Sequence, residues 1–140
     1  MRNLLLSAAL AMTPVLASAQ DDSPGAFADY DAYASFVTDA MARGEVLDIL
    51  GRMTDLDQLN VGQRAQLEEQ MAERWPGTYP NSDLMKDEKL GNFSREIRAF
   101  WTDQSRYGFF YAYLHHLPEG GVQVVHFGVS GDVNEIFKAF

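Results

Sequence analysis

The sequence predicts an α+β domain in which N-terminal helices pack on a curved antiparallel sheet formed by the C-terminal half, with a short C-terminal helix. Two observations carry this prediction. Between residues 27 and 75 apolar residues recur at helical spacing, whereas beyond residue 92 they alternate with a period of two. Helices that precede a run of strands are the pattern of the α+β class, because such strands form an antiparallel sheet.

Length and composition narrow the classes of function. The chain has 140 residues, enough for one domain, and its 11 Lys and Arg against 20 Asp and Glu give a formal net charge of −9. This acidic balance argues against nucleic acid and anionic membranes as partners, since both require a basic face. The chain contains no cysteine, which excludes disulfides, thiol nucleophiles and thiolate metal sites.

The first 19 residues predict a secretory signal peptide. Arg2 provides the positive start, an apolar run at residues 4–16 follows, and the small residues A-S-A precede a cleavage point between Ala19 and Gln20. A membrane anchor is the alternative, but about 13 apolar residues, interrupted by Pro14, are fewer than the roughly 20 that span a bilayer. We therefore expect an exported, soluble, periplasmic protein that does not insert into the membrane after cleavage.

The helical half follows a polar leader at residues 20–26 that we expect to be flexible, and a single α+β domain is expected to cover residues 27–140. Helical spacing from Phe27 onward predicts a first helix, which Gly44 ends as a left-handed cap. The apolar stripe of this helix consists of Tyr33, Phe36, Val37, Ala40 and Met41. A second, shorter helix has its stripe at Val46, Ile49, Leu50 and Met53.

A third helix begins at Asn60, which forms a capping-box pattern with Gln63. Its apolar face has one residue every four positions and consists of Leu67, Met71 and Trp75. Pro76 and Gly77 end it. The next region, residues 77–92, has the composition of a loop, with a helical turn at 83–90, and is interpreted as a solvated connector or as a lid over a pocket.

Period-two alternation predicts three strands. The first is expected to be half-buried, because the apolar Ile97, Ala99 and Trp101 alternate with the polar Glu96 and Arg98. The aromatic-rich run 107–117 and its partner 122–129 form a hairpin through the sequence P-E-G-G. A helix over residues 132–140 closes the chain, since Asp132 and Glu135 form another capping-box pattern.

The hairpin sorts its side chains onto two faces. A four-residue loop at 118–121 sets Tyr113 opposite His126, whereas a two-residue turn sets His115 opposite His126. Both registers have the same parity, so one face carries Phe109, Tyr111, Tyr113, His115, Val124 and His126. The other face is apolar and is expected to pack on the helices; it carries Phe110, Ala112, Leu114, His116, Val125, Phe127 and Val129.

The order of these segments resembles the nuclear transport factor two-like superfamily. The resemblance rests on helices first, then a break, then the strand Y-G-F-F-Y-A-Y-L at 107–114, a glycine turn and V-V-H-F-G-V at 124–129. It implies a cone, an antiparallel sheet wrapped round a long helix with a cavity between sheet and helices. Because its members include isomerases, dehydratases and many non-catalytic binding modules, the resemblance assigns no function.

Five side chains are candidate ligand contacts: Tyr111, Tyr113, His115 and His126 on the Tyr and His face, and Trp101. An aromatic face with hydroxyls and imidazoles suits either a concave pocket or a partly wetted surface. An imidazole beside a hydroxyl also suits acid–base chemistry. No catalytic residue is assigned, however, because the sequence places no carboxylate beside either histidine.

No metal site and no cofactor are predicted. His115, His126 and Glu96 are candidate ligands, but zinc needs three or four convergent groups and the sequence does not bring these together. The segment D-L-D-Q-L at 55–59 begins like a calcium loop but has Asn60 where glycine is needed. The chain also lacks a glycine-rich phosphate loop, a G-x-S-x-G elbow and an H-E-x-x-H motif.

The first functional hypothesis is an exported, non-catalytic binding or interaction module whose Tyr and His face contacts a small apolar ligand or a protein partner. A second copy of the chain, forming a homodimer, is a further candidate partner. The alternative is a small cofactor-free enzyme of the isomerase, dehydratase or hydrolase type, with His115 or His126 as acid or base inside the cone. An enzyme requires a histidine in a water-poor cavity, whereas an interaction module requires exposed apolar surface.

Overall fold

The computed structural model describes residues 23–140, so the predicted signal peptide and its cleavage point at Ala19 and Gln20 lie outside the described residues. The elements are β1 (Ala26–Phe27), α1 (Tyr30–Arg43), α2 (Val46–Met53), the 3-10 helix η1 (Leu56–Gln58), α3 (Val61–Arg74), β2 (Asn81–Leu90), β3 (Phe93–Trp101), β4 (Tyr107–His116), β5 (Val122–Ser130) and α4 (Val133–Ala139). The strands form one antiparallel sheet in the order β1-β5-β4-β3-β2. The α+β class and the predicted order, with helices before the main strands, are thus confirmed.

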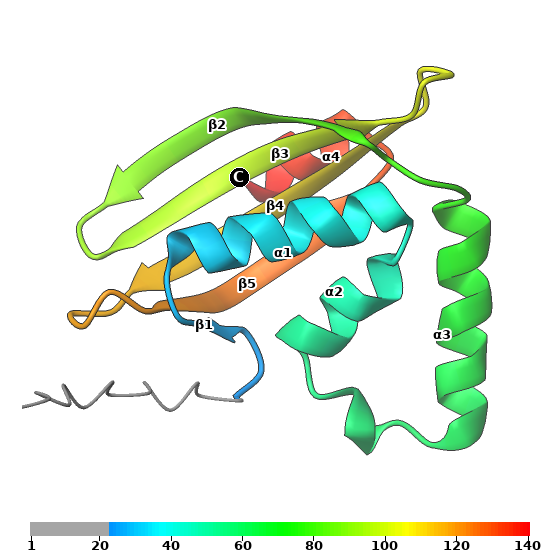
Figure 1. The fold of residues 1–140 in the computed structure, drawn as a ribbon, viewed down its shortest axis with the longest axis horizontal. Helices are drawn as coiled ribbons and strands as arrows, with labels where there is room; N and C mark the ends of the chain where they lie inside the picture. Colours follow the sequence, from blue (N-terminus) through cyan, green and yellow to red (C-terminus); the bar gives the residue numbers. More distant parts are fainter. Residues whose placement is uncertain (1–22) are drawn as a thin grey trace, which may run out of the picture.

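The two faces of the sheet meet different helices. In Figure 1, α1 lies in front of the sheet and α4 lies behind it. We term the face toward α1 the inner face and the opposite face the outer face. The main core fills the space between the inner face and the helices α1 and α2, and its fully buried members include Tyr33, Val37, Met41, Ile49, Phe100, Phe110 and Leu114. Among residues 23–140 no helix is long and apolar enough to cross a membrane.

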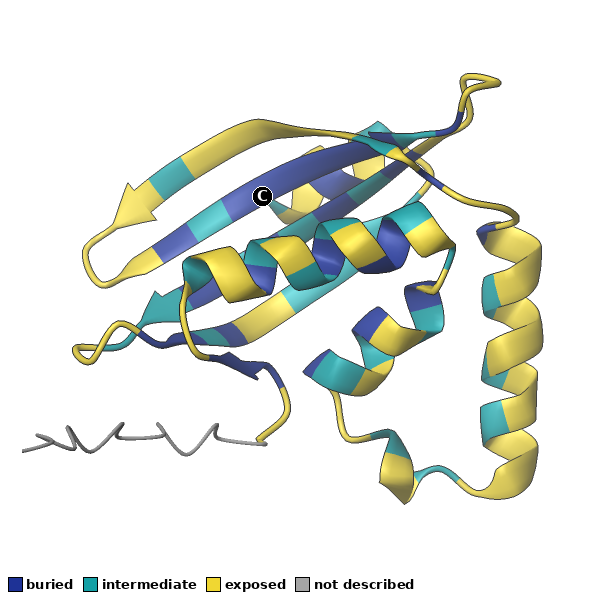
Figure 2. Ribbon diagram, viewed as in Figure 1, coloured by how far each residue is buried: buried dark blue, intermediate teal, exposed yellow. Residues whose placement is uncertain are grey.

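The predicted caps of α1 and α3 are present. Gly44 ends α1 in the left-handed conformation with φ 75°, and Asn60 and Gln63 form a reciprocal capping box at the start of α3. The helix α3 itself has no buried residue and is exposed over most of its length in Figure 2. Its predicted apolar stripe therefore reaches the core only at its C-terminal end, through Met71 and the buried Trp75.

Part of the segment expected to be a flexible leader is packed. Residues 26–27 form β1, which pairs with the start of β5. The Gly25 N–H donates to the Arg52 carbonyl at 2.8 Å, and the Arg52 guanidinium lies 4.5 Å from the centroid of the Phe27 ring. Strand pairing uses backbone groups, so the polar composition of this segment gave no indication of it.

The region 77–92, interpreted from the sequence as a connector or lid with a helical turn at 83–90, is mostly a strand. Residues 81–90 form the edge strand β2, which pairs with β3 along its length. An edge strand has a neighbour on one side only, and most side chains of β2 are exposed, so no apolar alternation marks it. Its charged residues are typical of an edge that is protected from further pairing. The rest of the region is the loop that ends at residue 80 and the β2–β3 turn at residues 91–92.

The β4–β5 hairpin has the predicted register at its centre and a different one near its turn. Tyr113 pairs with His126, as a four-residue loop predicts. The loop has five residues, 117–121, and a β-bulge at Val125 compensates for the extra residue. The face assignment was therefore wrong for Val124, which is buried on the inner face, and for Val125, which is 59% exposed.

The strand β3 is buried on both faces, which corrects the prediction that it is half-buried. Glu96 and Arg98 lie on the inner face under α1, with 0% and 8% of their surface exposed. Ile97 and Ala99 are buried on the outer face. The polar residues of the alternation were interpreted as a wet face because the sequence does not show what covers them.

The helix α4 begins at Asp132, as predicted, and covers part of the outer face. The Asp132 side chain accepts from the Asn134 N–H, but Glu135 accepts from Ser130 Oγ at 2.6 Å and so does not complete the predicted capping box. Ile136 is 2% exposed, and the Tyr113 hydroxyl of β4 donates to the Ala139 carbonyl at 3.1 Å. These contacts hold α4 against β4 and β5.

Candidate functional site

A group of buried polar side chains connects α1 to the inner face, and we term Tyr30, Tyr33, Glu96 and Arg98 the inner polar cluster. Tyr33 and Tyr30 donate their hydroxyl hydrogens to the two carboxylate oxygens of Glu96, at 2.8 and 2.7 Å. Arg98 Nε donates to Glu96 at 2.6 Å, and a second nitrogen of Arg98 donates to the Tyr30 hydroxyl at 2.7 Å. The Glu96 carboxylate thus connects the strand β3 to two tyrosines that lie about one turn apart on the helix α1.

The pKa shifts in the inner polar cluster arise from burial and from contacts within the cluster. Burial and the hydrogen bond to Glu96 raise the pKa of Tyr30 to about 12. Burial and the charge of Glu96 raise the pKa of Tyr33 well above its ordinary value. Burial alone would lower the pKa of Arg98, but Glu96 and the tyrosines outweigh it, so the guanidinium remains charged. At neutral pH the cluster holds one ion pair and two neutral phenols.

This network is a structural one. Within the described residues every buried side-chain nitrogen and oxygen has a hydrogen-bond partner, so no polar group in the network is left for a ligand. The sequence offered one weak signal of it: Glu96 and Arg98 have opposite charges, lie two residues apart and alternate with the apolar Ile97 and Ala99. The partners Tyr30 and Tyr33 lie more than 60 positions earlier in the chain, so only the fold brings them to Glu96.

A serine and a histidine also meet on the inner face. Ser94 Oγ lies 2.7 Å from His116 Nε2, a distance typical of a nucleophile and its base. Ser94 is only 3% exposed, however, so its hydroxyl offers no open approach for a substrate. The contact satisfies both side chains at the end of β3.

The outer face brings together three of the five predicted contact residues, and we term Tyr111, Tyr113 and His126 the outer aromatic cluster. The Tyr111 hydroxyl lies 2.8 Å from His126 Nε2, and the Tyr111 and Tyr113 rings meet edge to face at 6.4 Å. The rings of Tyr113 and His126 are 6.2 Å apart. The Tyr111 ring lies over Gly128, where a Cβ atom would overlap it. His126 is exposed, so this cluster presents aromatic edges and an imidazole to solvent.

The other two predicted contact residues lie apart from this cluster. His115 stacks on the exposed ring of Phe93 at 4.4 Å, at the end of the outer face near the β2–β3 turn. Trp101 pairs with Tyr107 at the opposite end of the same face. The five residues therefore share a face but form no single pocket.

The acid–base role expected for His115 or His126 required a cavity between the sheet and the helices. Both imidazoles instead lie on the face opposite α1, and the described residues contain no group of three or more acidic residues and histidines that could hold a metal ion. Glu96, which was considered with the two histidines as a metal ligand, lies on the inner face. The sheet thus separates Glu96 from both imidazoles.

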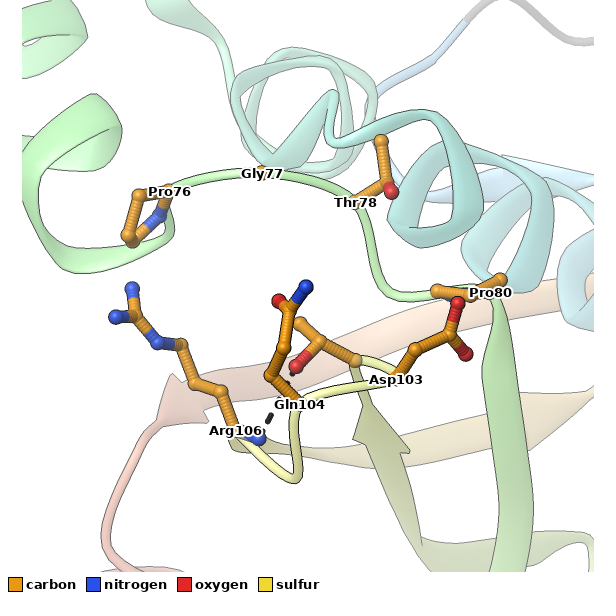
Figure 3. Close-up of a pocket in the computed structure, with 8 residues that line it drawn as sticks. Pro76, Gly77, Thr78, Pro80, Asp103, Gln104 and Arg106 are labelled. Atoms are coloured by element: carbon orange, nitrogen blue, oxygen red, sulfur yellow. Dashed lines mark hydrogen bonds between the residues drawn. The ribbon is translucent and has the colours of Figure 1, made fainter.

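Two surface pockets lie elsewhere in the structure. The larger, of about 490 Å³, lies where the α3–β2 loop meets the β3–β4 turn (Figure 3), and we term it the end pocket. Its lining residues are Pro76, Gly77, Thr78, Pro80, Thr102, Asp103, Gln104 and Arg106. The second, of about 340 Å³, lies beside η1, with Arg52, Asp55 and Arg64 among its lining residues. None of the five predicted contact residues lines either pocket.

Comparison with solved structures finds a protein described as an NTF2-like transpeptidase from Campylobacter jejuni. The superposition has a TM-score of 0.40 and 8% sequence identity, and it covers 67% of this chain and 94% of that chain. No protein-family model matches the sequence, and no curated protein matches it. A similarity of this size carries no argument about activity.

Proposed function

We propose that this chain is a non-catalytic interaction module that binds a protein partner through the outer face of its sheet. The observation that carries the proposal is the distribution of exposed apolar side chains. Five large ones lie on the outer face, on α4 or at the β5 bulge beside His126 and are between 44% and 59% exposed: Leu90, Phe93, Tyr107, Val125 and Phe137. Exposed apolar surface of this kind, mixed with polar groups, is typical of interaction sites.

The shape of this face favours a protein over a small ligand. Small molecules bind in concave sites that enclose most of their surface, and the two pockets described above lie away from the outer aromatic cluster. Tyrosine and histidine combine apolar area with a polar tip, which suits a broad and partly wetted interface. The inner polar cluster supports the non-catalytic part of the proposal, because its groups bind one another.

The test compares two exposed valines that differ in position. Val125 lies beside the outer aromatic cluster, whereas Val61 begins α3 and is 88% exposed. Native mass spectrometry of the purified protein and its Val125→Asp and Val61→Asp variants identifies what each retains. We expect a protein partner with the wild type and with Val61→Asp, and its loss with Val125→Asp. Equal retention by both variants would contradict the proposal, and a doubled mass would identify the partner as a second copy.

We also propose that the protein is exported to the periplasm. The support is the charge, apolar run and small residues of positions 1–19. Expression of the full chain in a bacterial host, followed by fractionation and N-terminal sequencing, tests this directly. A periplasmic product that begins at Gln20 is the expected result, and a cytoplasmic product that retains Met1 would contradict it.

A further inference from the structure

The end pocket has two rigid walls. The loop wall, residues 76–80, is anchored by the buried Trp75 on one side and by Tyr79, whose N–H donates to the Met41 carbonyl at 2.9 Å. Trp75 and Tyr79 also contact each other edge to face, with ring centroids 5.8 Å apart. The exposed residues between these anchors are therefore held in place, so this side of the pocket exists before any ligand arrives.

The second wall is the β3–β4 turn, residues 102–106. Three hydrogen bonds close it: Thr102 N–H to the Arg106 carbonyl, Ser105 N–H to the Thr102 carbonyl, and Arg106 N–H to Thr102 Oγ1. Ser105 has φ 60°, in the left-handed region that favours glycine. A strained residue held by a tight turn indicates a wall whose geometry is determined by the fold.

The charges of the pocket lie at its two ends. In Figure 3 the Arg106 guanidinium lies toward Pro76, the Asp103 carboxylate lies toward Pro80, and the Gln104 amide projects between them. Asn81 Nδ2 donates to Asp103 at 3.3 Å, which orients the carboxylate. One cation and one anion at opposite ends, with an amide in the middle, form a dipolar site.

We propose that the end pocket binds a short peptide in its zwitterionic form, with the peptide carboxylate on Arg106 and its ammonium on Asp103. Guanidinium groups bind carboxylates through paired, charge-assisted hydrogen bonds. The Gln104 amide both donates and accepts, which suits a peptide group between the two charged ends. A volume of about 490 Å³ lies within the range of small-ligand sites and has room for more than a single amino acid.

Charge favours a zwitterion over the simpler ligand classes. A phosphate-bearing ligand would meet Asp103 and a chain of net charge −9 with one guanidinium to offset them. A free cation would meet Arg106. A zwitterion carries no net charge, so the acidic surface does not repel it and both charged residues bind it.

Isothermal titration with trialanine, its N-acetylated form and its C-terminal amide tests the proposal. We expect saturable binding of free trialanine and at least about ten-fold weaker binding of either capped form, since each loses one charged contact. Arg106→Gln should weaken binding of trialanine about ten-fold and remove the preference for the free carboxylate. Asp103→Asn should instead remove the preference for the free ammonium.

The matched control is Arg64→Gln, which removes an arginine from the second pocket and should leave the affinity for trialanine unchanged. Asp103 and Arg106 are exposed, so their variants are expected to fold, and circular dichroism checks this. The proposal is overturned if trialanine shows no saturable binding up to about 10 mM, if the capped forms bind as well as the free peptide, or if Arg64→Gln has the same effect as Arg106→Gln.

Discussion

The two faces of one sheet carry similar side chains and use them differently. On the inner face, a glutamate and an arginine bind each other and two tyrosines of the covering helix α1. The outer face holds tyrosines and histidines whose rings contact one another but remain partly open to solvent. The difference shows that burial under a helix, more than residue type, determines whether a polar group is structural or is available to a partner.

The sharpest test of this comparison replaces one glutamate on each face. Glu96→Ala leaves Arg98 buried without its anion, and we expect it to lower the free energy of unfolding by about 3–5 kcal/mol. Glu88→Ala breaks the pair with Arg95, which is partly exposed, and should cost less than about 1 kcal/mol. Urea denaturation measures both. Equal losses of unfolding free energy would mean that burial under α1 does not make the pair of Glu96 and Arg98 more important than the pair of Glu88 and Arg95.

A second pair of variants uses two glycines, each with an aromatic ring over it. A Cβ atom at Gly108 would overlap the ring of Trp75, which is 6% exposed and cannot move away, so Gly108→Ala should cost about 1–3 kcal/mol. A Cβ atom at Gly128 would overlap the Tyr111 ring, which is only half-buried and so meets less resistance when it shifts than Trp75 does. Thermal denaturation should therefore show a smaller loss for Gly128→Ala, and the opposite order would contradict the assignment of the two faces.

Alkaline pH should destabilise the inner face. The pKa of Tyr30 is raised to about 12 and that of Tyr33 is raised well above its ordinary value, so the folded state binds both phenolic protons more tightly than the unfolded state. This contribution to stability is complete below about pH 10 and is lost as the pH rises through about 12.

Urea midpoints measured between pH 8 and pH 12 test this, with the double variant Tyr30→Phe, Tyr33→Phe for comparison. The wild type should lose stability steeply above about pH 10, and the double variant should show a shallower slope. Tyr79, whose pKa burial also raises, is expected to contribute to the slope that remains. An unchanged slope in the double variant would assign the alkaline loss to other groups.

The smallest effect is expected for Tyr111→Phe on the outer face. It removes the hydroxyl that lies 2.8 Å from His126 Nε2, a contact exposed to water, so the free energy of unfolding should change by about 0.5 kcal/mol or less. Tyr33→Phe removes a buried hydroxyl from Glu96 and should cost about 1–3 kcal/mol. Chemical denaturation of the two variants compares the two faces, because each substitution removes a single hydroxyl group.

Particular residues show how far the sequence could be interpreted. The left-handed cap at Gly44 and the capping box of Asn60 and Gln63 follow from neighbours in the chain and were predicted. The pairing of Tyr113 with His126 was one of the two registers that the sequence left open. The edge strand β2 was missed because its side chains meet no core. The bulge at Val125 was missed because it compensates for the extra residue of a five-residue loop, and the alternation of apolar residues does not show the length of that loop.

By itself the sequence determined the α+β class, the caps of the helices and the presence of an aromatic face, because these depend on interactions over a few residues or on a simple period. The tertiary structure decided which polar groups are enclosed and which are free. Glu96 is structural because α1, more than 60 positions earlier, covers it, and His126 is exposed because it lies on the face opposite α1, with its ring against Tyr111 and Tyr113. The end pocket likewise exists because a loop and a turn from distant segments meet.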